Sequence, residues 1–107
     1  MVKRKLYIVH MEEILFEWDD RKDEANLRKH GIEFQEAVSA FYDEYAQVFY
    51  DPDHSESEDR FILLGLSLNL RTLVVCHCYR ENERVIRIIS ARNADSAEER
   101  DYWRERS

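Results

Sequence analysis

The spacing of hydrophobic residues changes from a helical to a strand-like period near Asp43, and this change constrains the fold more than any other feature of the sequence. Before it, Phe34, Ala37, Val38 and Phe41 recur at the spacing of one buried helical stripe. After it, short apolar runs alternate with turn residues, which is typical of consecutive antiparallel strands. We therefore expect an α+β domain.

The expected element order is β-α-α-β-β-β-β-α, with an antiparallel sheet of about four to five strands, two N-terminal helices and a C-terminal helix. Asp19 or Asp20 is suited to cap the first helix, and Gly31 is suited to end it. A capping-box pattern that starts at Ser96 opens the last helix. The expected strands cover residues 14–18, 45–50, 61–68, 72–79 and 84–91, and the expected helices cover residues 20–30, 34–41 and 96–106.

Residues 14–107 are expected to form a single domain, because a chain of 107 residues with 44% hydrophobic content has room for one ordinary core. Residues 1–13 fit this plan less well. They form either an extra strand at residues 6–9 or an extension that precedes an alternative start at Met11, and the sequence leaves both interpretations open.

No membrane segment and no signal peptide are expected. The longest apolar runs, at residues 61–66 and 73–78, are far shorter than the roughly 20 residues that span a bilayer. The N-terminal apolar stretch is not followed by a small-residue cleavage site. We therefore expect a cytoplasmic protein, in which Cys76 and Cys78 are reduced and buried, because two residues this close on one strand cannot easily close a disulfide.

The net charge of −7 argues against a simple nucleic-acid binder, because phosphate contact usually leaves a basic footprint. The charge is unevenly distributed, however. Residues 71–93 hold five basic and two acidic side chains, so the last hairpin is the one basic segment.

Arginines interrupt the otherwise core-like run at residues 84–92. The functional interpretation is that their guanidinium groups bind a scissile phosphate and stabilise the charge that develops on it. The alternative is a set of structural salt bridges to carboxylates. Regular alternation places Arg84 and Arg92 on one face of the strand and Arg87 on the other, so we expect at most one of these faces to line an active site.

His77 precedes the hairpin turn and is a candidate general acid or base, with a packed core histidine as the alternative. Lys22, Asn26 and Lys29 share one stripe of the first helix, which either contacts RNA or is simply solvated. Neither Cys76-His77-Cys78 nor the acidic turn around His54 has the spacing of a metal site, and no cofactor is expected. A metal-dependent hydrolase that uses Asp53 and His54 is a distant alternative.

Seven short motifs occur in an order and at a spacing that is specific when they are taken together. They are Phe16-Glu17-Trp18-Asp19, Asn26-Leu27-Arg28-Lys29-His30-Gly31, Phe34-x-x-Ala37, Asp51-Pro52-Asp53-His54, Glu58-x-Arg60-Phe61, Leu64-Gly65 and Arg87-Ile88-Ile89-Ser90-Ala91-Arg92. From about residue 16 to residue 102, the chain resembles the BrnT family of type II toxins.

This resemblance implies a RelE-like fold and a ribonuclease that cleaves RNA without a metal ion, uses the 2′-hydroxyl as nucleophile and inhibits translation. It also implies neutralisation by a BrnA-type antitoxin with a ribbon-helix-helix DNA-binding domain, so that DNA is contacted only through the partner. The second hypothesis is a non-catalytic corepressor that acts with such an antitoxin. Two departures from the family pattern are Asp19-Asp20 in place of Asp-Pro and an unusually acidic C-terminal helix.

Roles for individual residues follow from the resemblance together with the expected hairpin geometry. Lys29, Arg87 and Arg92 lie in the family motifs, whereas His77 and Arg80 rest more on chemistry. The expected site consists of His77 as acid or base, Arg80, Arg87 and Arg92 around the phosphate, and Lys22 and Lys29 as RNA contacts.

Overall fold

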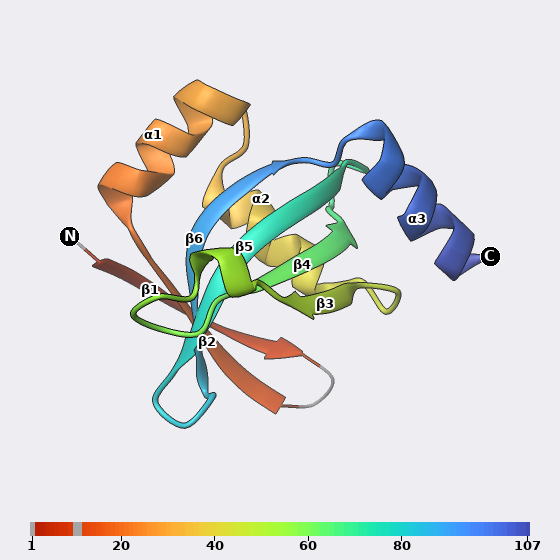
Figure 1. Ribbon diagram of the computed structural model, residues 1–107. Helices are drawn as coiled ribbons and strands as arrows, with labels where there is room; N and C mark the ends of the chain where they lie inside the picture. Colours follow the sequence, from red (N-terminus) through yellow and green to blue (C-terminus); the bar gives the residue numbers. More distant parts are fainter. Residues whose placement is uncertain (1, 10–11) are drawn as a thin grey trace.

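One six-stranded sheet, with its strands in the order β1-β2-β6-β5-β4-β3, forms the frame of the molecule (Figure 1). The computed structural model describes the backbone of residues 2–9 and 12–107 and the side chains of residues 13–107. The elements are β1 (Val2–Val9), β2 (Glu12–Asp19), α1 (Asp20–His30), α2 (Phe34–Ser39), the 3-10 turn η1 (Ala40–Tyr42), β3 (Gln47–Tyr50), the 3-10 turn η2 (Pro52–His54), β4 (Phe61–Leu66), β5 (Thr72–Arg80), β6 (Val85–Asn93) and α3 (Ser96–Arg106).

The expected α+β class is confirmed, but the sheet differs from the expected one in width and in direction. It has six strands because β1 pairs along the whole of β2, with Val2 opposite Asp19. It is mixed because β2 runs parallel to β6, whereas the other neighbouring strands run antiparallel. The parallel pair arises because the chain leaves β2 through two helices, passes through β3 to β5 and returns beside β2 in the original direction.

The limits of α1 follow from its caps, as expected from the sequence. The Asp19 carboxylate accepts a hydrogen bond from the backbone N–H of Arg21 at 2.8 Å, which satisfies one of the unpaired donors in the first turn. Gly31 ends the helix with φ of 72° and donates its N–H to the carbonyl of Leu27. Glycine adopts this left-handed conformation without the strain that a Cβ atom would cause.

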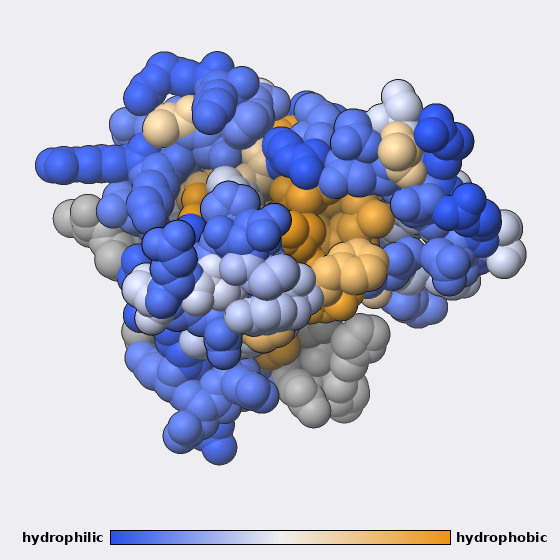
Figure 2. Space-filling model, in the orientation of Figure 1, coloured by the Kyte–Doolittle hydropathy of each residue, from blue (hydrophilic) through white to orange (hydrophobic). Residues whose placement is uncertain are grey.

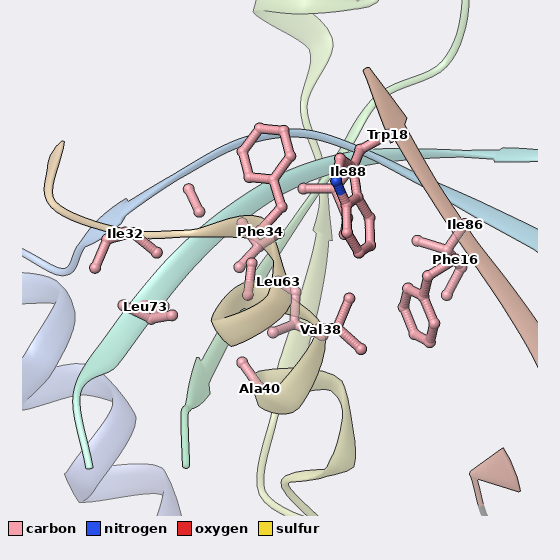
Figure 3. Packing of buried hydrophobic residues seen from close by; sticks show 13 residues of the cluster. Phe16, Trp18, Ile32, Phe34, Val38, Ala40, Leu63, Leu73, Ile86 and Ile88 are labelled. Atoms are coloured by element: carbon pink, nitrogen blue, oxygen red, sulfur yellow. The ribbon is translucent and has the colours of Figure 1, made fainter. Parts of the chain in front are cut away.

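The main core lies between α2 and one face of the sheet, where large side chains from both layers interlock (Figure 3). Trp18 is 2% exposed and meets Phe34 edge to face, with 6.3 Å between ring centroids. Residues at alternate positions of β5, including Leu73 and Val75, complete this layer. The opposite face of the sheet faces the viewer in Figure 1, and α3 covers it at one end.

Helix α3 packs through Tyr102 against Leu64 and Val74 on this second face. Its N-cap is Asp95 rather than the expected Ser96, and Glu98 rather than Glu99 closes the capping box. The Asp95 carboxylate accepts from the N–H of Glu98 at 2.8 Å, and the Glu98 carboxylate accepts from the N–H of Asp95 at 2.9 Å. Among the described residues, no helix is long and apolar enough to cross a membrane.

A β-bulge in β6 changes which residues share a face of the sheet. Cys76 pairs with Ser90, but the next residue of β5, His77, pairs with Ile88, so Ile89 is an extra residue in β6. Ile88 and Ala91 consequently both face the main core. The predicted alternation of residues 84–92 was therefore wrong beyond residue 88, because an inserted residue reverses the direction of every side chain that follows it.

Candidate functional site

Three arginines of the last hairpin lie on the same face of the sheet, opposite α2. Arg87 pairs with Cys78 and Arg92 pairs with Val74, and residues directly opposite each other on antiparallel strands share a face. Cys78 and Val74 are four residues apart on β5, and Arg80 follows at the same alternation. The bulge at Ile89 is what brings Arg92 to the face of Arg87.

Arg87 and Arg80 converge on one buried carboxylate. Glu17 is 2% exposed, and its Oε2 accepts a hydrogen bond from Arg87 Nε at 2.7 Å and lies 3.8 Å from Arg80 Nε. Arg80 also donates from Nη2 to Glu58 at 3.0 Å. A carboxylate this deeply buried needs a cationic partner, so Arg87 stabilises the fold as well as contributing charge to the surface.

Arg92 is held by a two-pronged ion pair with Glu98 of α3. The two N–H···O distances are 2.8 and 3.0 Å, which is the forked geometry that guanidinium and carboxylate prefer. The hydrogen bonds from Arg92 lower the pKa of Glu98 to about 2, and those to Glu98 raise the pKa of Arg92. Arg87 and Arg92 thus form the structural salt bridges of the alternative interpretation, and Arg80 does so as well, although the side chains of Arg80 and Arg92 remain 43% and 42% exposed.

His77 does not lie with these arginines. It is fully buried on the opposite face, where its ring packs edge to face on Phe41 at 4.9 Å between centroids. Its Nδ1 lies 3.0 Å from the carbonyl oxygen of Val75, and burial lowers its pKa from 6.5 to about 4. A histidine closed off from solvent cannot reach an RNA phosphate on the other side of the sheet, so the geometry contradicts the predicted role of His77 in proton transfer.

Lys22 and Lys29 are exposed on α1, but Asn26, expected between them on a solvent-facing stripe, is buried. Asn26 donates to the carbonyls of Ile32 and Ala91, each at 2.8 Å, and accepts from the N–H of Ala91 at 3.0 Å. The amide attaches α1 to β6 in this way. Both lysines therefore flank the contact between helix and strand, within one turn of the point where α1 meets β6.

The face of the sheet that carries Arg80, Arg87 and Arg92 is called the arginine-bearing face below. A hollow of about 220 Å³ lies on it beside Arg92. The loop between β3 and β4 contributes Asp51, His54 and Arg60 to its wall, and the sheet contributes Cys76, Ser90 and Arg92. Figure 2 shows an apolar area of surface next to this loop. Ile62 and Val74 line the hollow on its apolar side.

Arg60 was not predicted as a functional residue, and His54 was named only in the distant alternative of a metal-dependent hydrolase. His54 Nδ1 lies 2.8 Å from Asp51 Oδ2, an arrangement that orients an imidazole for proton transfer. The signal available in the sequence was a histidine three residues after an aspartate, but this pattern is also ordinary in an acidic turn that contains proline. Among the described residues, no group of three or more His, Cys, Asp and Glu side chains is arranged to hold a metal ion.

Residues 18–98 match the family model described as the ribonuclease toxin BrnT of type II toxin-antitoxin systems. The chain belongs to this BrnT family. It is also similar to the crystal structure of the ribonuclease toxin BrnT from Brucella abortus at 1.1 Å resolution, with a TM-score of 0.56 and 25% sequence identity. The similarity covers 74% of this chain and 94% of that one. No curated protein matches the chain.

The region that matches the BrnT family includes Arg80, Arg87 and Arg92 but not Glu17, which lies one residue before it. It contains α1 with its two lysines, the loop with Asp51 and His54, and the whole of β5 and β6. Its last residue is Glu98, the partner of Arg92. The arginines and the hollow beside them therefore belong to the part of the chain on which the family assignment rests.

Proposed function

We propose that this BrnT-family ribonuclease toxin cleaves RNA on the face that carries Arg80, Arg87 and Arg92, and thereby inhibits translation. The observation that supports this most directly is the bulge in β6, which brings Arg92 to the face of the sheet that already carries Arg80 and Arg87. Guanidinium groups arranged in this way can bind a phosphodiester and stabilise the negative charge that builds up during its cleavage.

In the proposed reaction, the ribose 2′-hydroxyl attacks the adjacent phosphorus and the 5′-oxygen leaves. Arg87 uses Nε for Glu17, and its two terminal nitrogens make no hydrogen bond with the described residues, so they can donate to a phosphate. Three guanidinium groups supply the positive charge that a metal ion would otherwise provide, and we therefore propose that cleavage needs no metal. Lys22 and Lys29 extend the RNA-binding surface along α1.

The partner class follows from the family, whose members belong to toxin-antitoxin systems. We propose that the antitoxin is of the BrnA type, with a ribbon-helix-helix domain that binds DNA, and that the toxin meets DNA only through it. Residues 94–107 hold five acidic and three basic side chains, which suits contact with a basic antitoxin segment. RNA cleavage that inhibits translation places the activity in the cytoplasm.

Expression in bacteria tests the proposal. We expect growth arrest with the unaltered chain and none with Arg92→Ala or Arg87→Lys, because both changes remove forked donors from the arginine-bearing face. Lysine is chosen at position 87 because it keeps a cation beside the buried carboxylate of Glu17. Arg100→Ala, at an exposed arginine near the middle of α3, is the matched control and should remain toxic.

Once purified, the unaltered chain and Arg100→Ala should cleave RNA, whereas Arg92→Ala and Arg87→Lys should not. The cleavage should persist in the presence of a chelator. Circular dichroism establishes that each variant is folded. If Arg92→Ala and Arg87→Lys are folded and fully toxic, the arginine-bearing face is not the site; if chelator abolishes cleavage, the proposed metal independence is wrong.

A non-catalytic corepressor is the second candidate, and the observation that favours it is that each of the three arginines already has a carboxylate partner. A surface neutralised in this way would serve a protein partner better than a phosphate. Purified toxin that never cleaves RNA, but tightens the binding of its antitoxin to DNA in a gel-shift assay, would establish this alternative.

A further inference from the structure

The turn η2 holds a histidine over the arginine-bearing face. In Figure 1 this turn and the loop after it cross in front of the sheet. The side chain of His54 is 66% exposed, whereas that of its partner Asp51 is only 9% exposed. The pair therefore consists of a sheltered carboxylate and an accessible imidazole.

Hydrogen bonds fix the loop that presents this pair. The N–H of Asp51 donates to the carbonyl of Arg60 at 2.9 Å, and the hydroxyl of Ser55 donates to the carbonyl of Asp51. The N–H of Arg60 in turn donates to the Ser55 hydroxyl at 2.9 Å. Both ends of the loop are thus tied together, and the imidazole is held at a defined position beside the sheet.

The bond to Asp51 determines which ring nitrogen of His54 is available. An ionised carboxylate accepts hydrogen bonds but does not donate them, so the neutral imidazole carries its proton on Nδ1. Nε2 is then the basic nitrogen, and it makes no hydrogen bond with the described residues. This is the relation between carboxylate and imidazole that enzymes use to orient a general base.

Charged groups from three elements surround this histidine. Arg60 is the last loop residue before β4, and Arg92 lies across the hollow on β6. The thiol of Cys76 on β5 lines the same hollow, and burial raises its pKa, so it stays neutral. Arg92 shares its charge with Glu98, whereas the guanidinium of Arg60 has no carboxylate partner among the described residues.

We propose that His54, positioned by Asp51, is the general base of the ribonuclease reaction, and that Arg60 and Arg92 bind the scissile phosphate beside it. His54 Nε2 takes the proton of the 2′-hydroxyl as the bond from O2′ to phosphorus forms and the bond from phosphorus to O5′ breaks. Water protonates the departing 5′-oxygen, and the imidazolium returns its proton to the hydroxide that remains. The products are a 2′,3′-cyclic phosphate and a 5′-hydroxyl.

This inference rests on the proposed ribonuclease function, and the assay separates the two. A mixed-sequence RNA labelled at its 5′ end is incubated with purified toxin at pH values from 5 to 9. If the unaltered chain does not cleave the RNA, the proposed function fails. If it cleaves and His54→Gln cleaves equally fast over the whole pH range, the ribonuclease function stands and the role of His54 is wrong.

The expected result is a loss of about 10²- to 10⁴-fold in rate for His54→Gln, which is the usual contribution of a positioned general base. Added imidazole should partly restore His54→Ala, because the position is open to solvent. His30→Gln, which removes a histidine at the end of α1, is the control for loss of an imidazole elsewhere.

Asp51 is a positioning residue in this scheme, and a double-mutant cycle tests it. Asp51→Asn should slow the unaltered chain by about tenfold or more, but should have little further effect in the His54→Gln background, because residues that act as a unit are not additive. Asp53→Asn, in the same turn, is the matched control. It should change the cleavage rate of neither the unaltered chain nor His54→Gln. Fully additive effects of Asp51→Asn and His54→Gln would overturn the proposed coupling.

Discussion

His54 and His77 show how the surroundings of a residue, rather than its type, decide its role. Both were visible in the sequence, and His77 was the more attractive prediction because it lies on a strand next to the basic hairpin. The structure buries it against Phe41 and instead leaves His54 exposed over the arginine-bearing face. Sequence indicates that a histidine is present, but not whether water and substrate can reach it.

Burial of His77 should make the stability of the protein depend on pH. Its pKa is about 4 in the folded protein and 6.5 when solvated, so the unfolded chain binds this proton more readily. Stability contributed by His77 is therefore present at neutral pH and lost as the pH falls from about 7 towards 4. Between pH 7 and pH 5, where most carboxylates stay ionised, we expect a loss of about 2 kcal/mol.

Urea unfolding at pH 7, 6 and 5 measures this loss. A His77→Gln variant cannot take up the proton, so its free energy of unfolding should fall less than that of the unaltered chain over this range, whatever its absolute stability. Subtracting the change measured for His77→Gln from the change measured for the unaltered chain removes the contributions of the other titrating groups. If the free energy of unfolding falls equally with pH in both proteins, His77 is not buried in its neutral form.

At the scale of elements, the sequence predicted what depends on neighbouring residues and missed what depends on distant ones. The caps of α1 and the limits of α3 follow from local side chains, and both agree closely with expectation. The bulge at Ile89 and the attachment of α1 through Asn26 depend on contacts between residues far apart in the chain. Periodicity alone cannot reveal either, so the shared face of Arg87 and Arg92 was not predictable.

The attachment of α1 to the sheet should depend strongly on Asn26. Replacing it with alanine removes three hydrogen bonds and leaves the N–H of Ala91 and two carbonyls without partners in a buried place. We expect Asn26→Ala to lower the free energy of unfolding by about 2 to 4 kcal/mol, measured in urea. Glu24→Ala, at an exposed position of the same helix, should change it by less than about 0.5 kcal/mol.

On the scale of the whole molecule, the net charge of −7 and the paired arginines describe an RNA-cleaving protein with little free positive charge. Lysines on α1 and arginines on the sheet should therefore contribute differently to RNA binding. A phosphate that binds an exposed lysine displaces counterions, whereas a phosphate that binds Arg92 competes with Glu98. The dependence of affinity on salt should distinguish these two kinds of contact.

Fluorescence anisotropy with a 2′-O-methyl RNA, which cannot be cleaved, measures this dependence. Lys22→Ala and Lys29→Ala should each reduce the slope of log affinity against log salt by about 0.7. Arg92→Ala should weaken binding but change the slope by clearly less, and Arg100→Ala should change neither. If Arg92→Ala reduces the slope as much as a lysine variant does, the ion pair with Glu98 is not retained in solution.

The bulge in β6 makes the length of this strand matter to the site as much as its side chains do. Arg87 and Arg92 are five positions apart, so a regular strand would place them on opposite faces, and the extra residue Ile89 is what returns Arg92 to the face of Arg87. Removing Ile89 would restore regular alternation and still leave both arginines on one face, because they would then be four positions apart. The proposed catalytic face is thus encoded partly in the length of a strand, which comparisons that score only the residues present would overlook.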